Sequence, residues 1–168
     1  YKCRVRYPWY RVPIVPAGDL LLSKRSHFFP QVISNHAGVL TTDTIYRGQV
    51  FPGETINADD FATVFHNSLT MLSAEILGRS FGGGVLELVP SEVNSLRVPV
   101  VPGAERHILE IDKISRKSNN HDDLLTKTDE LLTKFIPTLD KNILSVLHDA
   151  RNTLLSRRMQ RTNSNFYL

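Results

Sequence analysis

Four predicted loops of the sequence offer side chains that can bind a negatively charged partner. They span residues 23–29, 35–38, 43–47 and 79–84. Lysine, arginine and small polar groups grip phosphates, while arginine, lysine, asparagine, glutamine, aspartate and glutamate can read the edges of bases. The chemistry that these loops favour is therefore the binding of an anionic ligand.

Each of these candidates also has a structural interpretation. Arg47 could pair with Asp43 or Glu54 across a sheet, and Arg79, which follows a helix end, could cap backbone carbonyls. The triple glycine at residues 82–84 opens left-handed backbone conformations and lets another chain approach closely. We interpret it as a backbone requirement of the fold in preference to a direct ligand contact.

Motifs for catalysis and metal binding are missing from the sequence. It has no Gly-x-Gly-x-x-Gly loop, no Walker loop, no His-Glu-x-x-His and no Gly-x-Ser-x-Gly elbow. The single Cys3 excludes an internal disulfide, and the six histidines lack the short spacings of a structural zinc site. We therefore expect the chain to be catalytically inert by itself and to hold no metal.

Length and composition are those of a globular protein with a real core. The 168 residues are 41% hydrophobic and 22% charged, which suits one domain or one domain with a helical appendix. No run approaches the roughly 18 apolar residues of a membrane span, and no signal-peptide pattern opens the chain. We expect no membrane association and a cytoplasmic location. The start at Tyr1, without Met, suggests a fragment or a processed chain.

Positive charge is concentrated near the N-terminus. The net charge is only +3, but residues 1–57 hold seven lysines and arginines against three acids. A local positive field of this kind suits an anionic partner such as a nucleic acid. The alternative is an ordinary solvated surface, which often carries such an excess.

The first 103 residues predict a sheet with packed helices. Apolar and β-branched runs predict strands at residues 20–22, 31–34, 39–50 and 85–89, in a mostly antiparallel or mixed sheet. Asn57 is the expected N-cap of a helix whose apolar stripe runs to a C-cap at Gly78, with Asn67 inside it. Closely spaced prolines near Trp9 favour an edge strand there, with Trp9 as a packing anchor.

Beyond Gly103 the pattern becomes helical. Apolar positions at helical spacing predict three helices, over about 108–117, 124–135 and 143–161, the second stopped by Pro137. Basic residues at the end of the last helix suit a helix C-terminus. We expect this tail to pack against the first domain or against a part of the protein outside this chain; the alternative is that it grips DNA through Arg157, Arg158 and Arg161. The expected fold is α+β, with a mixed or antiparallel sheet domain at 1–103 and a helical C-terminal extension at 104–168.

A block around the triple glycine carries a family resemblance. Residues 78–92, Gly-Arg-Ser-Phe-Gly-Gly-Gly-Val-Leu-Glu-Leu-Val-Pro-Ser-Glu, and Leu-Arg-Val-Pro at 96–99 resemble the C-terminal target-recognition region of bacterial adenine-specific (N6) DNA methyltransferases of restriction-modification systems. Pro-Trp-Tyr-Arg-Val-Pro at 8–13 resembles the start of that region. The stretch from 129–132 through 155–161 resembles its helical tail with a basic end. The similarity spans nearly the whole chain.

The resemblance implies that the chain recognises the DNA target for a catalytic domain lying upstream. In such enzymes an [Asn/Asp/Ser]-Pro-Pro-[Tyr/Phe] motif holds the flipped adenine and a glycine-containing motif binds S-adenosylmethionine; this sequence has neither. Both would belong to the upstream domain. The expected partners are double-stranded DNA and that domain, and S-adenosylmethionine is expected in the parent enzyme and not in this chain.

The DNA-binding residues that we expect lie in the four loops. Our hypothesis is that the basic side chains contact phosphates or guanines, with amide, imidazole and glycine positions as further candidates. The full set is Lys24, Arg25, Asn35, His36, Arg47, Arg79, Gly82, Gly83 and Gly84. The alternative function is a protein–protein docking or specificity module of a multi-subunit restriction-modification complex, which a dimerising tail would favour.

Overall fold

The computed structural model describes residues 4–11, 15–118 and 120–164, with side chains through residue 160. Its α+β architecture confirms the predicted fold class. The strands are β1 Leu20–Ser23, β2 Arg25–Ser26, β3 Val32–Ser34, β4 Ile45–Gly48, β5 Arg79–Phe81 and β6 Val85–Glu87. The helices are α1 Ala58–Phe65, α2 Ser68–Leu77, the 3₁₀ turn η1 Gly82–Gly84, α3 Pro90–Val93, the 3₁₀ turn η2 Ala104–His107, α4 Ile108–Lys117, α5 His121–Phe135 and α6 Lys141–Ser164.

The strands of the described residues pair into two small antiparallel sheets. Sheet A has the order β3–β1–β4, and sheet B has the order β2–β6–β5. Only Lys24 separates β1 from β2, so the chain passes from one sheet to the other at this residue. The two sheets are therefore connected through Lys24, which belongs to the predicted basic loop at residues 23–29.

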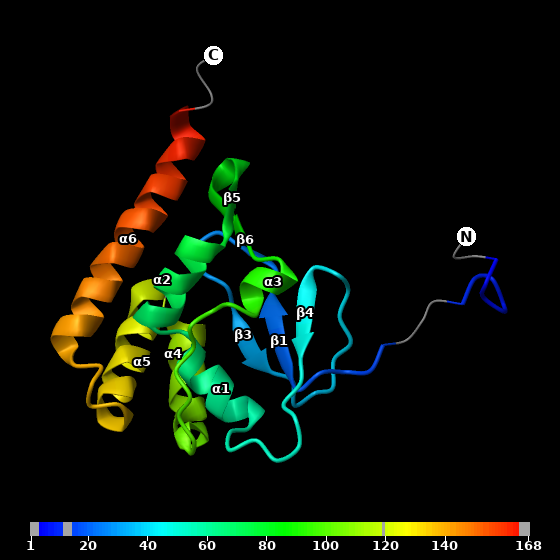
Figure 1. Cartoon of the computed structure of the whole chain (residues 1–168), viewed down its shortest axis with the longest axis horizontal. Helices are drawn as coiled ribbons and strands as arrows, with labels where there is room; N and C mark the ends of the chain where they lie inside the picture. The colour runs from blue at the N-terminus through cyan, green and yellow to red at the C-terminus, as the bar shows by residue number, and fades with distance from the viewer. Residues whose placement is uncertain (1–3, 12–14, 119, 165–168) are drawn as a thin grey trace.

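The main core lies between sheet A and helices from both halves of the chain. Its buried side chains are Leu20, Leu22, Phe29, Val32, Ala62, Phe65, Met71, Ile111, Leu124 and Leu125. Figure 1 shows α1, α4 and α5 on one side of sheet A, with α6 running along α2 toward sheet B. Burial of these apolar groups is the dominant force that fixes sheet A against the helices.

The predicted boundary at Gly103 falls on a left-handed turn, with φ of 78°, that leads into η2. Ile111 of α4 and Leu124 and Leu125 of α5 belong to the same hydrophobic cluster as the leucines of β1. The helices after Gly103 thus share a core with the sheet that precedes it. The division into 1–103 and 104–168 remains a prediction about sequence units.

The helix predicted from Asn57 to Gly78 is wrong in one respect, because the structure has two helices there. Asn57 does cap α1, as predicted. The backbone then breaks at His66 and Asn67, and Asn67 is the N-cap of α2 and not an interior residue: its side-chain oxygen accepts the N–H of Thr70 at 2.9 Å. The apolar stripe continues through the break, so periodicity alone does not reveal it.

Strand lengths also differ from the prediction. The run predicted as a strand over residues 39–50 forms only β4, and the preceding turn closes with a hydrogen bond from Gly38 N to Asn35 O of 3.1 Å. Arg25 and Ser26, predicted as part of a loop, form β2 because they pair with β6. Such pairing between distant segments decides strand limits, and the local sequence carries little of it.

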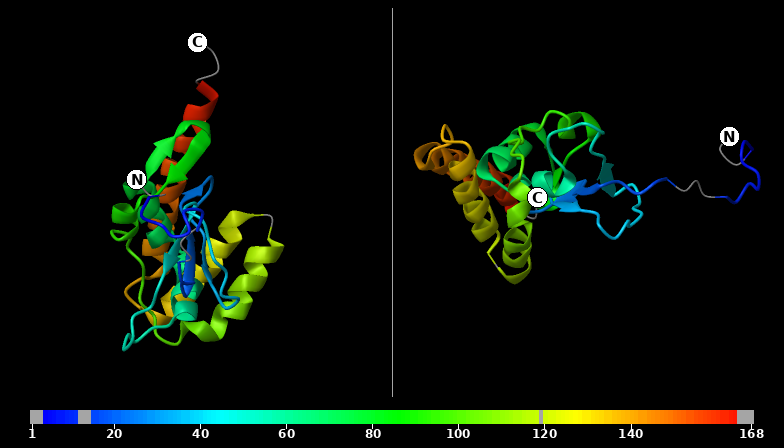
Figure 2. Two further views of the ribbon diagram at one scale, coloured as in Figure 1. Left: turned by 90° about the vertical axis from the view of Figure 1, so that its right-hand side faces the viewer. Right: turned by 90° about the horizontal axis from the view of Figure 1, so that it is seen from below.

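The aromatic segment near the N-terminus extends away from the sheets and helices (Figure 2). Trp9 and Tyr10 are largely exposed, and their rings meet edge to face with centroids 5.8 Å apart. The prediction that Trp9 anchors packing is therefore wrong. Residues 4–11 form no strand, since their backbone bond, from Arg11 N to Pro8 O, is local. The neighbouring residues 12–14 of the predicted edge strand lie outside the described part.

Across the described residues, no helix combines the length and the apolar character that a membrane crossing requires.

Candidate nucleic-acid interface

Three of the predicted basic residues lie together on sheet B. The strand register places Arg25 of β2 and Arg79 of β5 opposite Glu87 of the central strand β6. The Nζ of Lys24 lies 3.4 Å from Glu87 Oε1, and the Arg25 guanidinium lies 3.2 Å from the same oxygen. Residues at one register position share a face of a sheet. Lys24, Arg25 and Arg79 thus form one group, which we name the sheet B cations.

The sheet B cations cover the acidic groups with which they pair. The Nε of Arg79 donates to Glu92 at 2.7 Å. The side chains of Glu87 and Glu92 are only 8% and 15% exposed, whereas those of Arg25 and Arg79 are 63% and 59% exposed. A partner approaching sheet B therefore meets guanidinium groups first.

Hydrogen bonding keeps the outer pair ionised. The bond to Glu92, together with its charge, raises the pKa of Arg79. Two donors lower the pKa of Glu92, first the backbone N–H of Val89 at 2.8 Å and then the Arg79 guanidinium. Only the Nε–H of Arg79 donates in this contact. Among the described residues, no acceptor forms a hydrogen bond with the N–H groups on its two terminal nitrogens. These donors are available to a ligand.

The predicted glycines form the tip of the hairpin that joins β5 to β6. Gly83 and Gly84 have φ of 79° and 70°, in the left-handed region that residues with a Cβ avoid. A Cβ on Gly82 or Gly83 would meet no atom within 4 Å, so the tip is thin and open on its outer side. The triple glycine thus has a backbone role in closing this turn.

An arginine of α6 holds the hairpin tip in place. Arg158 donates from Nη1 to the carbonyls of His27 and Gly84, the first at 2.7 Å. Its Nε and Nη2 donate to the two carboxylate oxygens of Glu75 on α2, at 3.0 and 2.6 Å. The side chains of Arg158 and Glu75 are each only 4% exposed. Figure 1 shows the end of α6 beside this hairpin.

A second buried arginine of α6 supports the loop that follows β2. Arg151 donates to the Phe28 carbonyl at 3.3 Å and to Asp122 at 3.1 Å, and its guanidinium lies 5.8 Å from the centre of the Phe29 ring. Burial is the main cause that lowers the pKa of Arg151. The tail therefore packs through Arg151, which was not among the predicted residues, and through Arg158, for which DNA contact was the alternative.

A signal for these two residues was present in the sequence. Arg151 and Arg158 are seven residues apart, and each follows an apolar residue of the last helix, Leu147 or Leu154, by four positions. That spacing puts both on the buried face of the helix. Arg157, which was considered beside them, is exposed, and the side chain of Arg161 lies outside the described part.

The remaining predicted residues lie apart from the sheet B cations. Asn35 uses its side chain to brace its own turn, donating to Gly18 O at 2.9 Å and accepting from Val39 N at 2.8 Å. His36 lies 2.8 Å from Asp59 of α1. These contacts join the turn after β3 to the segment before β1, to Val39 and to α1.

Arg47 is on β4, also in sheet A, and donates to the Pro16 carbonyl at 2.5 Å. This bond goes to a backbone carbonyl and not to Asp43 or Glu54, the predicted partners of Arg47. The predicted set is therefore divided. The sheet B cations and the glycines lie at sheet B and its hairpin, whereas Arg47 lies on sheet A and Asn35 and His36 lie in the turn after β3.

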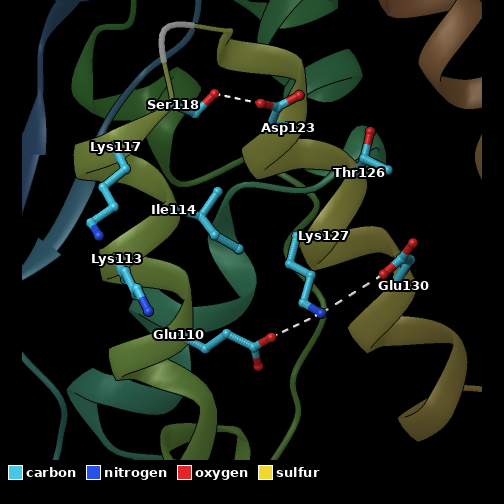
Figure 3. Close-up of a pocket in the computed structure, with 9 residues that line it drawn as sticks. All are labelled: Glu110, Lys113, Ile114, Lys117, Ser118, Asp123, Thr126, Lys127 and Glu130. Carbon is cyan, nitrogen blue, oxygen red and sulfur yellow. Dashed lines mark hydrogen bonds and ion pairs between the residues drawn. The ribbon is translucent and has the colours of Figure 1, made fainter.

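A groove of about 640 Å³ between α4 and α5 offers a different surface (Figure 3). Lys127 lies between two carboxylates there, with its Nζ 2.8 Å from Glu110 and 3.9 Å from Glu130. The charged side chains that line it are Glu110, Lys113, Lys117, Asp123, Lys127 and Glu130. Three lysines thus face three carboxylates, and this balance does not favour an anionic ligand.

A buried Ser–Asp–His cluster joins α2, α5 and α6. The hydroxyl of Ser68 donates to Asp129 at 2.5 Å and lies 3.3 Å from His148 Nδ1, and the Ser68 N–H also donates to Asp129 at 2.9 Å. Ser68 has no exposed surface, so no substrate can reach its hydroxyl, and the carboxylate serves as an N-terminal partner of α2. Burial is the main cause that raises the pKa of Asp129. No cluster suited to a metal ion exists among the described residues.

Comparison with known proteins identifies the family. The model of the C-terminal domain of the Type II methyltransferase M.Eco57I matches residues 1–133, a span that includes both sheets and the triple-glycine hairpin. No curated protein and no solved structure matches the chain. The family match covers more than half of the sequence and confirms the resemblance to a restriction-modification methyltransferase. The chain therefore belongs to the family of Type II methyltransferase C-terminal domains that the M.Eco57I domain represents.

Proposed function

We propose that the chain is the DNA target-recognition module of a site-specific adenine-N6 methyltransferase. The observation that carries this proposal is the position of Arg25 and Arg79, exposed on one face of sheet B above the less exposed carboxylates of Glu87 and Glu92. Membership of a methyltransferase C-terminal family makes DNA the natural anionic partner for that face. The S-adenosylmethionine site and the adenine pocket would lie in a separate catalytic domain.

The geometry suits contacts to the phosphate backbone. An arginine presents five N–H donors in a planar guanidinium group. Arg25 and Arg79 each use only some of these donors to contact a carboxylate. Glu87 and Glu92 hold the guanidiniums in place from beneath, so less side-chain entropy is lost when a phosphate binds. Lys24, less exposed, would add charge to the same contact.

The adenine specificity rests on the sequence resemblance of residues 78–92 and 96–99 and on the chemistry of base modification. An enzyme that modifies a base must extrude it from the stack, and a separate lobe that grips the duplex can supply the sequence specificity. The hairpin that carries Arg79 and the triple glycine is the part of this chain that we assign to that grip.

Binding of a random-sequence duplex, measured by fluorescence anisotropy at several salt concentrations, tests the proposal. We expect weak binding by the full chain with a steep negative salt slope. In the double variant Arg25→Gln/Arg79→Gln the slope should become shallower by about 2, since each lost phosphate contact removes about 0.9. Arg116→Gln is the matched control, because Arg116 is an exposed arginine that pairs with Asp112 on α4. An unchanged slope in the double variant would overturn the proposal.

A second candidate function, docking on another protein, is favoured by one observation. A groove of about 310 Å³ between β3 and α4 is flanked by two exposed apolar side chains, Ile33 and Leu109. Apolar groups in this position suit a protein surface better than a phosphate backbone. If docking is the main role, Leu109→Asp should abolish association with the separately expressed catalytic domain while leaving DNA binding unchanged, and association insensitive to this variant would exclude the groove.

A further inference from the structure

The aromatic side chain at the hairpin tip has no role in the core. Phe81 is the last residue of β5 and is 49% exposed. Among the aromatic contacts of the described residues its ring stacks on no other ring. It belongs to none of the hydrophobic clusters found in the described part. Single exposed apolar side chains are common on protein surfaces, so the position of this ring, and not its exposure alone, carries the argument.

The tip around Phe81 is slender. The two residues that follow it, Gly82 and Gly83, have no neighbouring atoms within 4 Å of where a Cβ would stand. No bulky side chain therefore flanks the ring on the outer side of the turn. A thin loop with one apolar ring can enter a narrow space that a broader hairpin could not.

The hairpin is held firmly at two places. Arg158 bonds the carbonyl of Gly84 and ties the tip to α6 and to Glu75 of α2. At the base, Gly78 approaches Leu86 so closely that a Cβ there would lie 2.6 Å from the leucine Cδ1. These contacts position the ring on a support that can resist a load, as a wedge must.

Phe81 also lies on the face that carries the sheet B cations. Arg79 and Phe81 are two residues apart on one strand, paired with Glu87 and Val85 of β6. Side chains two apart on a strand point to the same face, with their Cα atoms about 7 Å apart. A duplex held on Arg25 and Arg79 through its phosphates would therefore bring its bases toward the ring.

We propose that Phe81 is a stacking wedge that inserts its ring between bases when the duplex is bound and opened. This inference rests on the proposed DNA-binding function. Apolar wedges of phenylalanine or leucine unstack base steps in several classes of DNA-binding protein, and an enzyme that modifies an adenine must separate the target base from its neighbours. The ring occupies stacking surface that the departing base leaves exposed.

The alternative is that Phe81 contacts the catalytic domain, as part of a protein–protein interface. The cations on the same face and the absence of other large apolar side chains at the tip favour bases as the partner, because a protein interface would bury a broader apolar area. The following experiment separates the two.

The test compares two duplexes of the same sequence, one intact and one with a single abasic site. The abasic site has already lost one stacking surface, so a wedge should bind it more tightly. We expect the full wild-type chain to prefer the abasic duplex by about 10-fold, within the range that one base–aromatic stack contributes. Phe81→Ala should bind both duplexes equally with an unchanged salt slope, and Phe81→Trp should keep the preference. Arg25→Gln/Arg79→Gln should weaken both complexes and keep their ratio.

A fluorescent reporter locates the ring directly. Trp9 is the single tryptophan of the chain, so the variant Trp9→Phe/Phe81→Trp places the only indole at the tip. Stacking on bases should quench its emission when the abasic duplex is added. Binding without a preference in the wild type, a preference that survives in Phe81→Ala, or an indole that stays unquenched in the complex would each overturn the wedge. Absence of binding to either duplex by the wild type at low salt would overturn the proposed function, and the wedge with it.

Discussion

Arginine serves opposite purposes on α6 and on sheet B. Arg151 and Arg158 are buried on α6 and donate to backbone carbonyls of residues 27, 28 and 84. Arg25 and Arg79 are exposed on sheet B and form ion pairs with Glu87 and Glu92, which are less exposed. A buried guanidinium must have its donors satisfied by the protein, whereas an exposed one can give them to a ligand. The first pair therefore builds the scaffold and the second is available for binding.

The comparison also explains why the end of the chain matters for the hairpin. The family match covers residues 1–133, and α6 begins at Lys141. The element that fixes the triple-glycine tip thus comes from beyond the matched range. The triple-glycine hairpin is held by Arg158, a side chain from a segment far along the sequence.

Removal of Arg158 should have the largest effect. Arg158→Met leaves Glu75 charged, buried and without its partner, so we expect the free energy of unfolding to fall by about 3–5 kcal/mol. Urea denaturation of the full chain measures it. Arg158→Met/Glu75→Met should recover part of the loss, because both charges are then gone.

The neighbouring exposed residue provides the control for this comparison. Arg157→Met should change stability by no more than about 0.5 kcal/mol, as surface substitutions usually do. Equal effects of the two single variants would contradict the distinction between buried and exposed arginines.

His66 gives an effect that depends on pH. It is buried between Phe29 and Phe65, and its Nε2 accepts the Val32 N–H at 3.4 Å. Burial lowers the pKa of His66 to about 4, from 6.5 in the unfolded chain. Unlike Arg158, it pairs with no acid in the part of the chain that the structure describes, so protonation opposes folding.

The sign follows from the lowered pKa. The contribution of neutral His66 is complete above pH 6.5 and is lost as the pH falls toward 4, by at most about 3 kcal/mol. Denaturant titrations at pH 7, 5.5 and 4 should show this loss in the wild type, and His66→Gln should show a smaller decline over the same range. Parallel stability curves for the two proteins would mean that His66 is protonated at no cost in the fold.

The sequence was informative where a local pattern decides the structure. Asn57 capped its helix, the three C-terminal helices followed their apolar spacing, and the triple glycine lay in a turn. The sequence was misleading where contacts between distant segments, or the lack of such contacts, determine the structure. The helix break at Asn67 lies inside a continuous apolar stripe, and Trp9 has the residue type of a core anchor although it is 67% exposed.

The candidate site was predictable in residue type but not in arrangement. Lys24 and Arg25 could be found as a basic pair, yet their proximity to Arg79 depends on β2 pairing with β6, which no short-range pattern specifies. Asn35 has the chemistry of a base reader and instead satisfies its own turn. A side chain's type limits what it can bind, and its hydrogen-bond partners in the fold decide whether it is available.

Removal of the exposed pair should have only a small effect on stability. In Arg25→Gln/Arg79→Gln, Glu87 keeps Lys24 as a partner at 3.4 Å. Glu92 loses Arg79 but is 15% exposed and keeps the backbone N–H of Val89 as a donor at 2.8 Å. Exposed ion pairs contribute about 0–1 kcal/mol each, and we expect a loss of no more than about 1 kcal/mol in urea denaturation. The same variant should lose much of its DNA affinity. A loss of stability as large as that of Arg158→Met would show that these arginines support the fold, and weaker DNA binding could then no longer be attributed to missing phosphate contacts.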